Sequence, residues 1–356
     1  MSAPPLKMNR RQVLTGLSAA GAAIFSEKVA AFPQTDTSDH VLQSHSPKED
    51  KALIAMTFDL EMSEHYPTWD QMEWNYEKGL LNGAAKDYAV KAAQRVKAAG
   101  GVMHDFVVGR VFEEENVDFL KEILSEGHQL GNHTYDHVDI LATRPEDIQF
   151  RFRRAPWLIY GKEPREVIIE NIRMTERAMK TRLGIYPKGF RAPGGFRTGI
   201  DNRPDIQLML ISLGYEWAST KYPSHPLTKP GENPNDEIFD AIVRAQKDAQ
   251  PYVQPSGLVE IPISPVSDVV SLRTCRWKLR DFHRALRAAL GWVIENGAVF
   301  DFLSHPSVIG VEDPGFETID MILDIVKSAG DRVAIVDPEI IGHRVRWRTP
   351  KTLARV

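Results

Sequence analysis

Short apolar runs recur along the chain from residue 51 onwards, and most of them end in polar residues. Their apolar residues follow one another without the alternation of a strand that faces water on one side, which is typical of parallel strands buried on both faces. We therefore predict strands at residues 53–60, 102–109, 189–195, 214–220, 257–264, 298–305 and 332–337.

Helical periodicity occupies several of the segments between these runs. Apolar residues recur three and four positions apart, before a glycine suited to end a helix, at 89–96 before Gly100, 117–124 before Gly127 and 319–326 before Gly330. Alternating strands and helices predict an α/β fold, a single parallel (β/α) barrel over residues 51–340. A C-terminal tail at 341–356 completes the expected organisation.

The N-terminus carries a different pattern. The pair Arg10-Arg11 precedes LSAAGAAIF, an apolar stretch well short of the roughly 20 residues needed to span a bilayer, and Val29-Ala30-Ala31 offers a small-residue cleavage site. This pattern resembles a twin-arginine export signal at residues 1–31, followed by a polar linker at 32–50. We expect a periplasmic or extracellular protein with no stable membrane anchor.

Composition narrows the classes of partner. The chain has 356 residues, of which 42% are hydrophobic and 26% charged, as expected of a large globular protein. A formal net charge of −4, with no long cluster of Lys or Arg, argues against nucleic acid as a partner. Cys275 is the only cysteine, so an intramolecular disulfide is excluded. Composition leaves the oligomeric state open.

Several polar residues follow the predicted strands at the same end of the sheet. They are Asp59, Glu61, Arg191, Asp268 and His305. In a parallel barrel this end carries the active site, because the loops that follow the strands converge there. Each residue alone could be a helix cap, a surface charge or part of a turn, but their shared position favours a functional site.

The stretch GNHTYDH at 131–137 contains two histidines four residues apart, His133 and His137. The pair could hold a metal ion, or it could be two polar residues on an ordinary helix. The zinc-protease helix is excluded, because Thr134 stands where that motif has its glutamate.

Four motifs occur in a fixed order: TFDLE at 57–61, HTYDH at 133–137, RAPGG at 191–195 and LSH at 303–305. Together they resemble the polysaccharide deacetylase family with the NodB homology domain, related to carbohydrate esterase family 4. The resemblance covers about residues 51–340 and implies a distorted seven-stranded barrel. It also implies a hydrolase that removes N-acetyl groups from a glycan with a metal-activated water.

The resemblance also implies the metal site. His133 and His137 correspond to metal ligands, with a carboxylate as the third ligand. We assign that place to Glu61, although Asp59 and Glu61 alternate to the same side of a strand and either could be the ligand. The expected cofactor is a divalent ion, zinc first, with cobalt, nickel or manganese as alternatives.

The resemblance implies catalytic roles as well. Asp59 resembles the general base, Arg191 the partner that keeps this base ionised, and His305 the general acid. The family often has an Asp–Trp pair that steadies the acid histidine, but LGYEWASTKYPSHP at 213–226 contains no Asp. Asp268 is our substitute for orienting His305, with a loop or helix cap as its alternative role.

Three segments are longer than the core motifs require. The loop 62–83 carries Tyr66, Trp69, Trp74 and Tyr76, which could stack on sugar rings or pack as a lid. A second polar, Pro-rich loop runs over 222–255. An arginine-rich helical insertion at 141–183 could meet an acidic glycan or another subunit.

The function expected from the sequence is an exported, metal-dependent deacetylase acting on an N-acetylated glycan. One alternative is an amidohydrolase that cleaves a C–N bond in a small amide, because relatives with a split Asp-x-Glu motif include enzymes that cleave ring amides. Another is a glycan-binding protein without catalysis, against which the presence of Arg191 and His305 argues.

Overall fold

The structure is a computed structural model that describes residues 51–62 and 78–349. The chain divides into two compact units, residues 1–45 and residues 46–356, and every described residue belongs to the second unit. The predicted export signal, the linker and the four aromatic residues of the 62–83 loop therefore lie outside the described residues.

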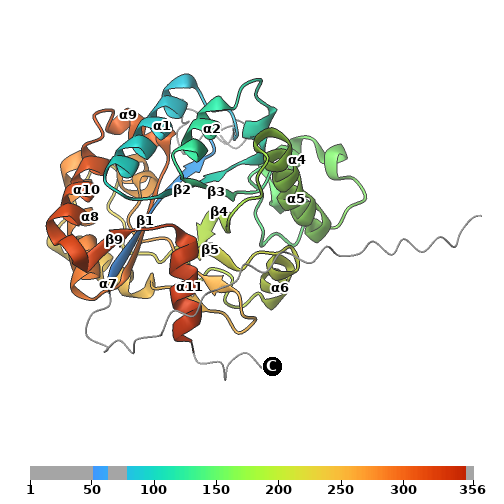
Figure 1. Cartoon of the computed structure of the whole chain (residues 1–356). Coiled ribbons are helices and arrows are strands. Elements are labelled where there is room, and N and C mark those ends of the chain that lie inside the picture. Colours follow the sequence, from blue (N-terminus) through green and yellow to red (C-terminus); the bar gives the residue numbers. More distant parts are fainter. Residues whose placement is uncertain (1–50, 63–77, 350–356) are drawn as a thin grey trace, which may run out of the picture. The chain divides into compact units, whose positions relative to one another are not determined.

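The described residues form a nine-stranded sheet with the order β6-β7-β5-β4-β3-β2-β1-β8, and β9 pairs with β1 (Figure 1). All neighbouring strands are parallel except β6 and β7. The strands are β1 (Ala52–Leu60), β2 (Met103–Val107), β3 (Gln129–Asn132), β4 (Phe190–Phe196), β5 (Trp217–Lys221), β6 (Tyr252–Val253), β7 (Val259–Glu260), β8 (Val299–Ser304) and β9 (Val333–Ile335). The parallel α/β barrel type is confirmed, and β3 and β6 are additional to the strands expected from sequence.

Strand β1 is the centre of this sheet. Its first half, from Ala52 to Ile54, pairs with β9, and its second half, from Met56 to Leu60, pairs with β2 on the same side. On its other side β1 pairs with β8. All nine residues of β1 are buried, which agrees with the continuous apolar run and places Asp59 and Glu61 at the end of the central strand.

The sheet curls until the segment after β7 meets β8. The backbone N–H of Ser264 donates to the carbonyl of Asp301 at 3.2 Å, and the Ser264 hydroxyl accepts from the Asp301 N–H at 3.0 Å. Pro262 and Pro265 lie on either side and have no N–H to donate. The contact is therefore limited to one residue of this segment, and the barrel is distorted here.

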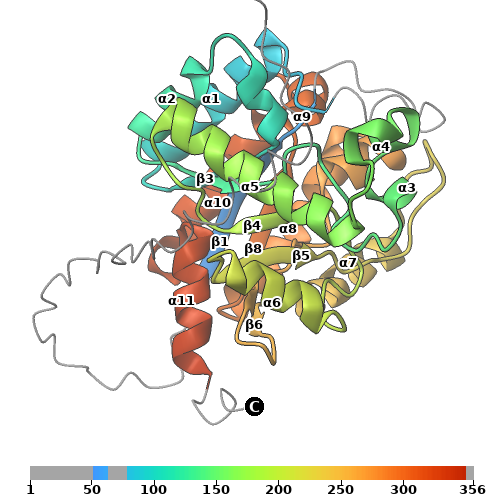
Figure 2. The same ribbon diagram turned by 90° about the vertical axis from the view of Figure 1, so that its right-hand side faces the viewer.

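Helices surround the strands in both views (Figures 1 and 2). The α-helices are α1 (Gly83–Ala98), α2 (Asp118–Ser125), α3 (Pro145–Ile148), α4 (Phe150–Arg154), α5 (Pro164–Leu183), α6 (Pro204–Ser212), α7 (Asp236–Asp248), α8 (Leu279–Glu295), α9 (Pro306–Glu312), α10 (Glu317–Ala329) and α11 (Pro338–Arg348). Shorter turns are η2 (Gly109–Glu113), η3 (Pro156–Ile159), the π-helical η4 (Val269–Thr274) and η5 (Gly330–Arg332). Within the described ranges, no helix combines the length and the apolar character needed to cross a membrane.

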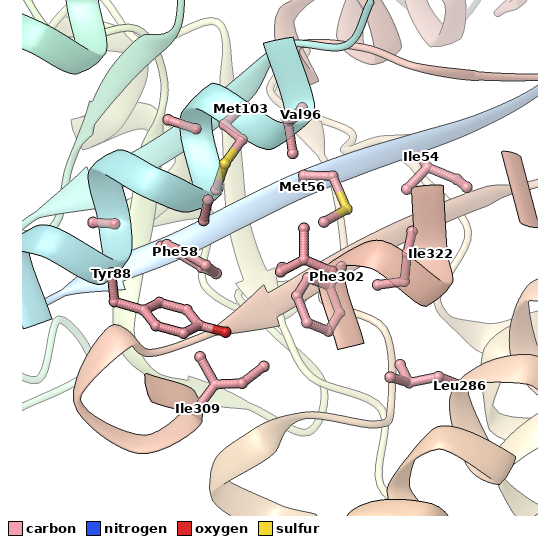
Figure 3. Packing of buried hydrophobic residues seen from close by; sticks show 14 of the residues in the cluster. Ile54, Met56, Phe58, Tyr88, Val96, Met103, Leu286, Phe302, Ile309 and Ile322 are labelled. Carbon is pink, nitrogen blue, oxygen red and sulfur yellow. The ribbon is translucent and has the colours of Figure 1, made fainter. Parts of the chain in front are cut away.

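The main apolar core lies between the outer face of the sheet and the helices. Met56 and Phe58 of β1 point toward Tyr88 of α1, Phe302 of β8 and Ile309 of α9 (Figure 3). Burying one such side chain contributes about 1.5–3 kcal/mol. Because side chains alternate along a strand, Thr57 and Asp59 point to the opposite, inner face.

Two boundaries from the sequence are wrong. Residues 341–348 are not a tail but most of helix α11, whose Ile341 is fully buried against the cluster that contains Trp217. The 222–255 segment is not one loop, because it contains α7, with the Asn235 side chain accepting from the Ile238 N–H at its start. Both helices were missed because prolines and charged residues around them hide a narrow apolar face.

Candidate active site

The segment that carries the two histidines is a turn, so the ordinary-helix interpretation is wrong. It follows β3, and both Thr134 and His137 have φ of 58°. The Asn132 side chain accepts from the Thr134 N–H at 2.8 Å, which stabilises the first bend. The turn brings the rings of His133 and His137 to a centroid distance of 5.0 Å, at 73° to each other.

The carboxylate of Glu61 lies next to His133 and His137. Oε2 of Glu61 lies 2.6 Å from Nε2 of His137 and 3.2 Å from Nε2 of His133. The ligand atoms of these three side chains all lie within 4.8 Å of one another, so they could hold a metal ion. Asp59 is more distant, with Oδ2 at 3.6 Å from the His133 Nε2. Glu61 therefore completes the cluster.

The Nδ1 contact of His133 and the low pKa of His137 suit a metal ligand set. Nδ1 of His133 lies 3.0 Å from the carbonyl oxygen of Arg191, which fixes the ring and leaves Nε2 free to accept. Burial lowers the pKa of His137 to about 4, even though Glu61 opposes this change. Two imidazoles and one carboxylate form a donor set that fits a divalent transition metal.

Lys78 is a site residue that sequence reasoning missed. It is buried, and its ammonium donates to Oε1 of Glu61. No sequence signal pointed to Lys78, because it lies within the long segment after β1 and belongs to none of the recognised motifs.

Arg191 is fully buried inside the barrel and contacts two carboxylates. Nη1 donates to Oδ1 of Asp59 at 3.0 Å and to the Thr57 hydroxyl at 2.9 Å, and Nη2 donates to Asp301. Its guanidinium lies 4.1 Å from the ring centroid of Phe106. The predicted contact between Arg191 and Asp59 is present, and the fixed guanidinium leaves Oδ2 of Asp59 directed at the histidines.

Asp301 was not predicted. It lies in β8, where Thr57 donates to its Oδ1 at 2.7 Å, and its burial raises its pKa while Arg191 opposes that rise. The signal that could have identified it is an aspartate in the middle of the apolar run AVFDFLSH. A buried charge of this kind persists only with a partner, and that partner is Arg191.

His305 faces the cluster from the opposite side. Its Nε2 lies 3.6 Å from Oε1 of Glu61 and 3.9 Å from Oδ2 of Asp59. Its Nδ1 lies 3.0 Å from Oδ1 of Asp268. Burial alone would lower the pKa of His305, but Asp268, then Glu61 and Asp59, raise it to about 9. Asp268 also accepts from the Val269 N–H at 2.8 Å, so it both contacts His305 and caps η4.

A pocket of about 290 Å³ opens beside His137. One wall is the end of β4, with Pro193, Gly194 and Phe196, and the other is formed by residues 147–150 and Arg153 of the insertion. The insertion expected to be helical therefore contributes α3 and α4 to the rim of the site.

Comparison with known proteins agrees with this fold. A protein from Mycobacterium smegmatis assigned as a polysaccharide deacetylase is 17% identical, with a TM-score of 0.57, over 88% of this chain and 97% of that chain. A second from Pseudomonas aeruginosa PAO1, assigned likewise, is 17% identical with a TM-score of 0.57, over 86% and 94%. The Puue allantoinase has the same identity and TM-score, over 88% and 94%. A search of curated proteins found no match.

The fold is of the parallel α/β barrel class, and the clustered side chains lie at the ends of its strands. Residues 46–215 match the sequence profile described as polysaccharide deacetylase. The match includes the motifs at 57–61, 133–137 and 191–195, and it agrees with the resemblance to the polysaccharide deacetylase family that these motifs predicted.

Proposed function

We propose that the protein is an exported, metal-dependent hydrolase that removes N-acetyl groups from a polysaccharide. The observation that carries this proposal is the convergence of Glu61, His133 and His137 within 4.8 Å, with Asp59 and His305 beside them. Deacetylation needs an activated water, a polarised amide carbonyl and a proton for the departing amine. The site offers one group for each requirement.

A divalent ion held by Glu61, His133 and His137 would supply Lewis-acid polarisation and a more acidic water; the two nitrogen ligands favour zinc. Asp59 takes the proton of the attacking water on Oδ2, because Arg191 occupies Oδ1. Arg191 also gives this buried carboxylate an ion-pair partner. Asp301 supports the base indirectly, because it holds the other end of the guanidinium.

His305 supplies the other proton transfer. With a pKa of about 9, its ring is protonated at neutral pH and can donate from Nε2 to the nitrogen of the departing sugar amine. Asp268 holds Nδ1 and so fixes the direction of Nε2. An oriented base and a protonated acid on two sides of one cluster favour an enzyme over a glycan-binding protein without catalysis.

The second candidate is the hydrolysis of a C–N bond in a small amide. The size of the pocket beside His137, about 290 Å³, favours this alternative, because a compact ring would fit there without any polymer. The Asp59-x-Glu61 spacing is compatible with both candidates.

Acetate release from a panel of acetylated glycans tests the proposal. Peptidoglycan, chitin oligomers and acetylated capsular polysaccharides should be compared with small cyclic amides, each at saturating zinc. We expect acetate from at least one glycan with the wild-type protein and none with Asp59→Asn, which keeps the shape of the base but not its charge. Ring opening of a cyclic amide without acetate release from any glycan would reject the deacetylase in favour of the second candidate.

A further inference from the structure

Lys78 occupies an unusual place for a lysine. Its side chain is 2% exposed, and that of its partner Glu61 is 4% exposed. Removing an ammonium group from water is costly unless a charged partner compensates. Glu61, the carboxylate of the histidine cluster, is such a partner, so the cluster contains a buried lysine of its own.

The two oxygens of Glu61 have different neighbours. Oε1 accepts from Lys78 and lies 3.6 Å from Nε2 of His305. Oε2 faces His137 at 2.6 Å and His133 at 3.2 Å. The other nearby carboxylate, Asp59, is bound to Arg191. Each negative charge at the site is therefore already paired with a basic side chain before any metal ion arrives.

We propose that Lys78 acts as a built-in cation that weakens metal binding at the Glu61, His133 and His137 cluster. It gives the buried carboxylate of Glu61 a hydrogen-bonding partner that does not depend on the ion, so the folded site can release and rebind its ion. This inference rests on the proposed metal-dependent function and adds to it a residue that controls the affinity for the metal.

Two opposing effects decide whether removal of Lys78 tightens or weakens metal binding. Lys78 orients Glu61, and loss of a residue that orients a metal ligand usually weakens binding by about 10–100-fold. Its positive charge also repels the ion, and charges about 4 Å apart in a partly screened site alter a binding constant by roughly a thousand-fold. Repulsion is the larger effect, so removal of the charge should leave metal binding about 10–100-fold tighter.

The test measures zinc affinity in Lys78→Met and Lys78→Gln. Methionine removes both the charge and the hydrogen bond, whereas glutamine removes the charge and keeps an N–H donor for Glu61. The matched control is Lys86→Met, which removes a lysine paired with Glu114. Competition with a chromophoric chelator gives the zinc dissociation constant of each protein. We expect tighter binding in both Lys78 variants, more so in Lys78→Gln, and the wild-type value in the control.

Thermal unfolding provides a second readout. Without zinc, both Lys78 variants should melt below the wild type, because the buried Glu61 loses its partner, and added zinc should raise their Tm more than it raises that of the wild type. Lys78→Gln remains measurable if Lys78→Met does not fold without zinc. Zinc affinity that is unchanged or weaker in the Lys78 variants would overturn the inference.

The proposed function is tested separately by acetate release at saturating zinc. A shift in zinc affinity without any acetate release would reject the deacetylase and keep the role of Lys78. Acetate release without a shift in zinc affinity would keep the deacetylase and reject the role of Lys78.

Discussion

The carboxylate of Asp268 binds His305 at two atoms. Oδ1 lies 3.0 Å from Nδ1 of the ring, and Oδ2 accepts from the His305 backbone N–H at 2.6 Å and from the Ser304 hydroxyl at 2.8 Å. Asp268 is fully buried, so this contact is shielded from water. The imidazole is therefore fixed in direction and biased toward its protonated form.

Asp268→Asn tests whether Asp268 orients His305 and favours its protonated form, or only stabilises the fold. The amide keeps the size of the side chain but loses its charge, so the pKa of His305 should fall from about 9 toward its ordinary value. An acid catalyst works only while protonated, so the alkaline limb of kcat/KM should move to lower pH, and kcat should fall by about 10²-fold. A pH–rate series on wild type and variant measures both. An unchanged alkaline limb would show that Asp268 only caps η4.

Loss of either cluster histidine should abolish metal binding. His133→Ala and His137→Ala each remove one of three ligands, so stoichiometric zinc should be lost along with nearly all activity. Elemental analysis of protein purified without chelator measures the ion. His283→Ala is the matched control, because His283 contacts Thr318 and belongs to none of the four motifs. Wild-type protein that holds no zinc or cobalt when offered either would contradict the prediction.

Asp105 should make stability depend on pH. Burial, and then the negative charge of Asp59, raise its pKa to about 8 from an ordinary 3.8. The folded state therefore binds this proton more tightly than the unfolded state, and the free energy of unfolding falls as pH rises from about 4 to about 8. The loss approaches about 1.4 kcal/mol per pH unit for one group.

Asp105→Asn removes this titration. Urea unfolding at several values between pH 5 and pH 9 should give a shallower decline for the variant than for the wild type. Asp331→Asn, at an exposed position in η5, serves as the control and should retain the wild-type slope. Parallel profiles for wild type and Asp105→Asn would mean that Asp105 does not titrate in this range.

The site residues at strand ends were predictable, because an apolar run predicts the strand and the alternation of side chains along it predicts which residues share a side. The apolar run at 53–60 predicted β1, and alternation placed Asp59 and Glu61 on one side, where both approach His133. The spacing of His133 and His137 predicted that the two side chains act as a pair, but not which backbone structure brings them together. A helix would bring residues four apart together, yet a turn with two positive φ values does so here.

The remaining site residues depend on contacts distant in sequence. Asp301 meets Arg191 across 110 positions, and its strand pattern says only that it is buried. Lys78 reaches Glu61 from beyond the 62–77 stretch, so no spacing links the two. Helix α11 is held by tertiary contacts of Ile341, which the pattern of its own sequence does not reveal. Each of these features requires the fold before it can be recognised.

Export should depend on the arginine pair, which lies outside the described residues. Replacing Arg10 and Arg11 by Lys keeps the charge but removes the twin-arginine pattern, so a folded precursor should accumulate inside the cell. Fractionation followed by immunoblotting measures the distribution. Lys7→Arg, which leaves the pair intact, should be exported normally. Unchanged appearance of the double variant in the periplasm or medium would refute the export signal.

His305→Ala tests catalysis itself. If the imidazole donates a proton to the leaving amine, the variant should keep its zinc and its substrate affinity while kcat falls by about 10²–10⁴-fold. A histidine with only a structural role would lower Tm and yield, with kcat per folded molecule nearly unchanged. The variant therefore needs zinc analysis, a melting curve and steady-state kinetics on one preparation.

The alkaline limb of the pH profile adds the decisive comparison. It should vanish in His305→Ala, because the group with a pKa of about 9 is gone. Persistence of that limb in an active variant would move the acid role to another residue. Of the two other histidines on the long loops, His65 lies outside the described residues. His225 is a poor replacement, because its Nδ1 lies 2.8 Å from the Pro226 carbonyl oxygen and burial lowers its pKa, so it would be deprotonated at neutral pH. A proton donor must carry its proton at the pH of the reaction, and His305 meets this condition while His225 does not.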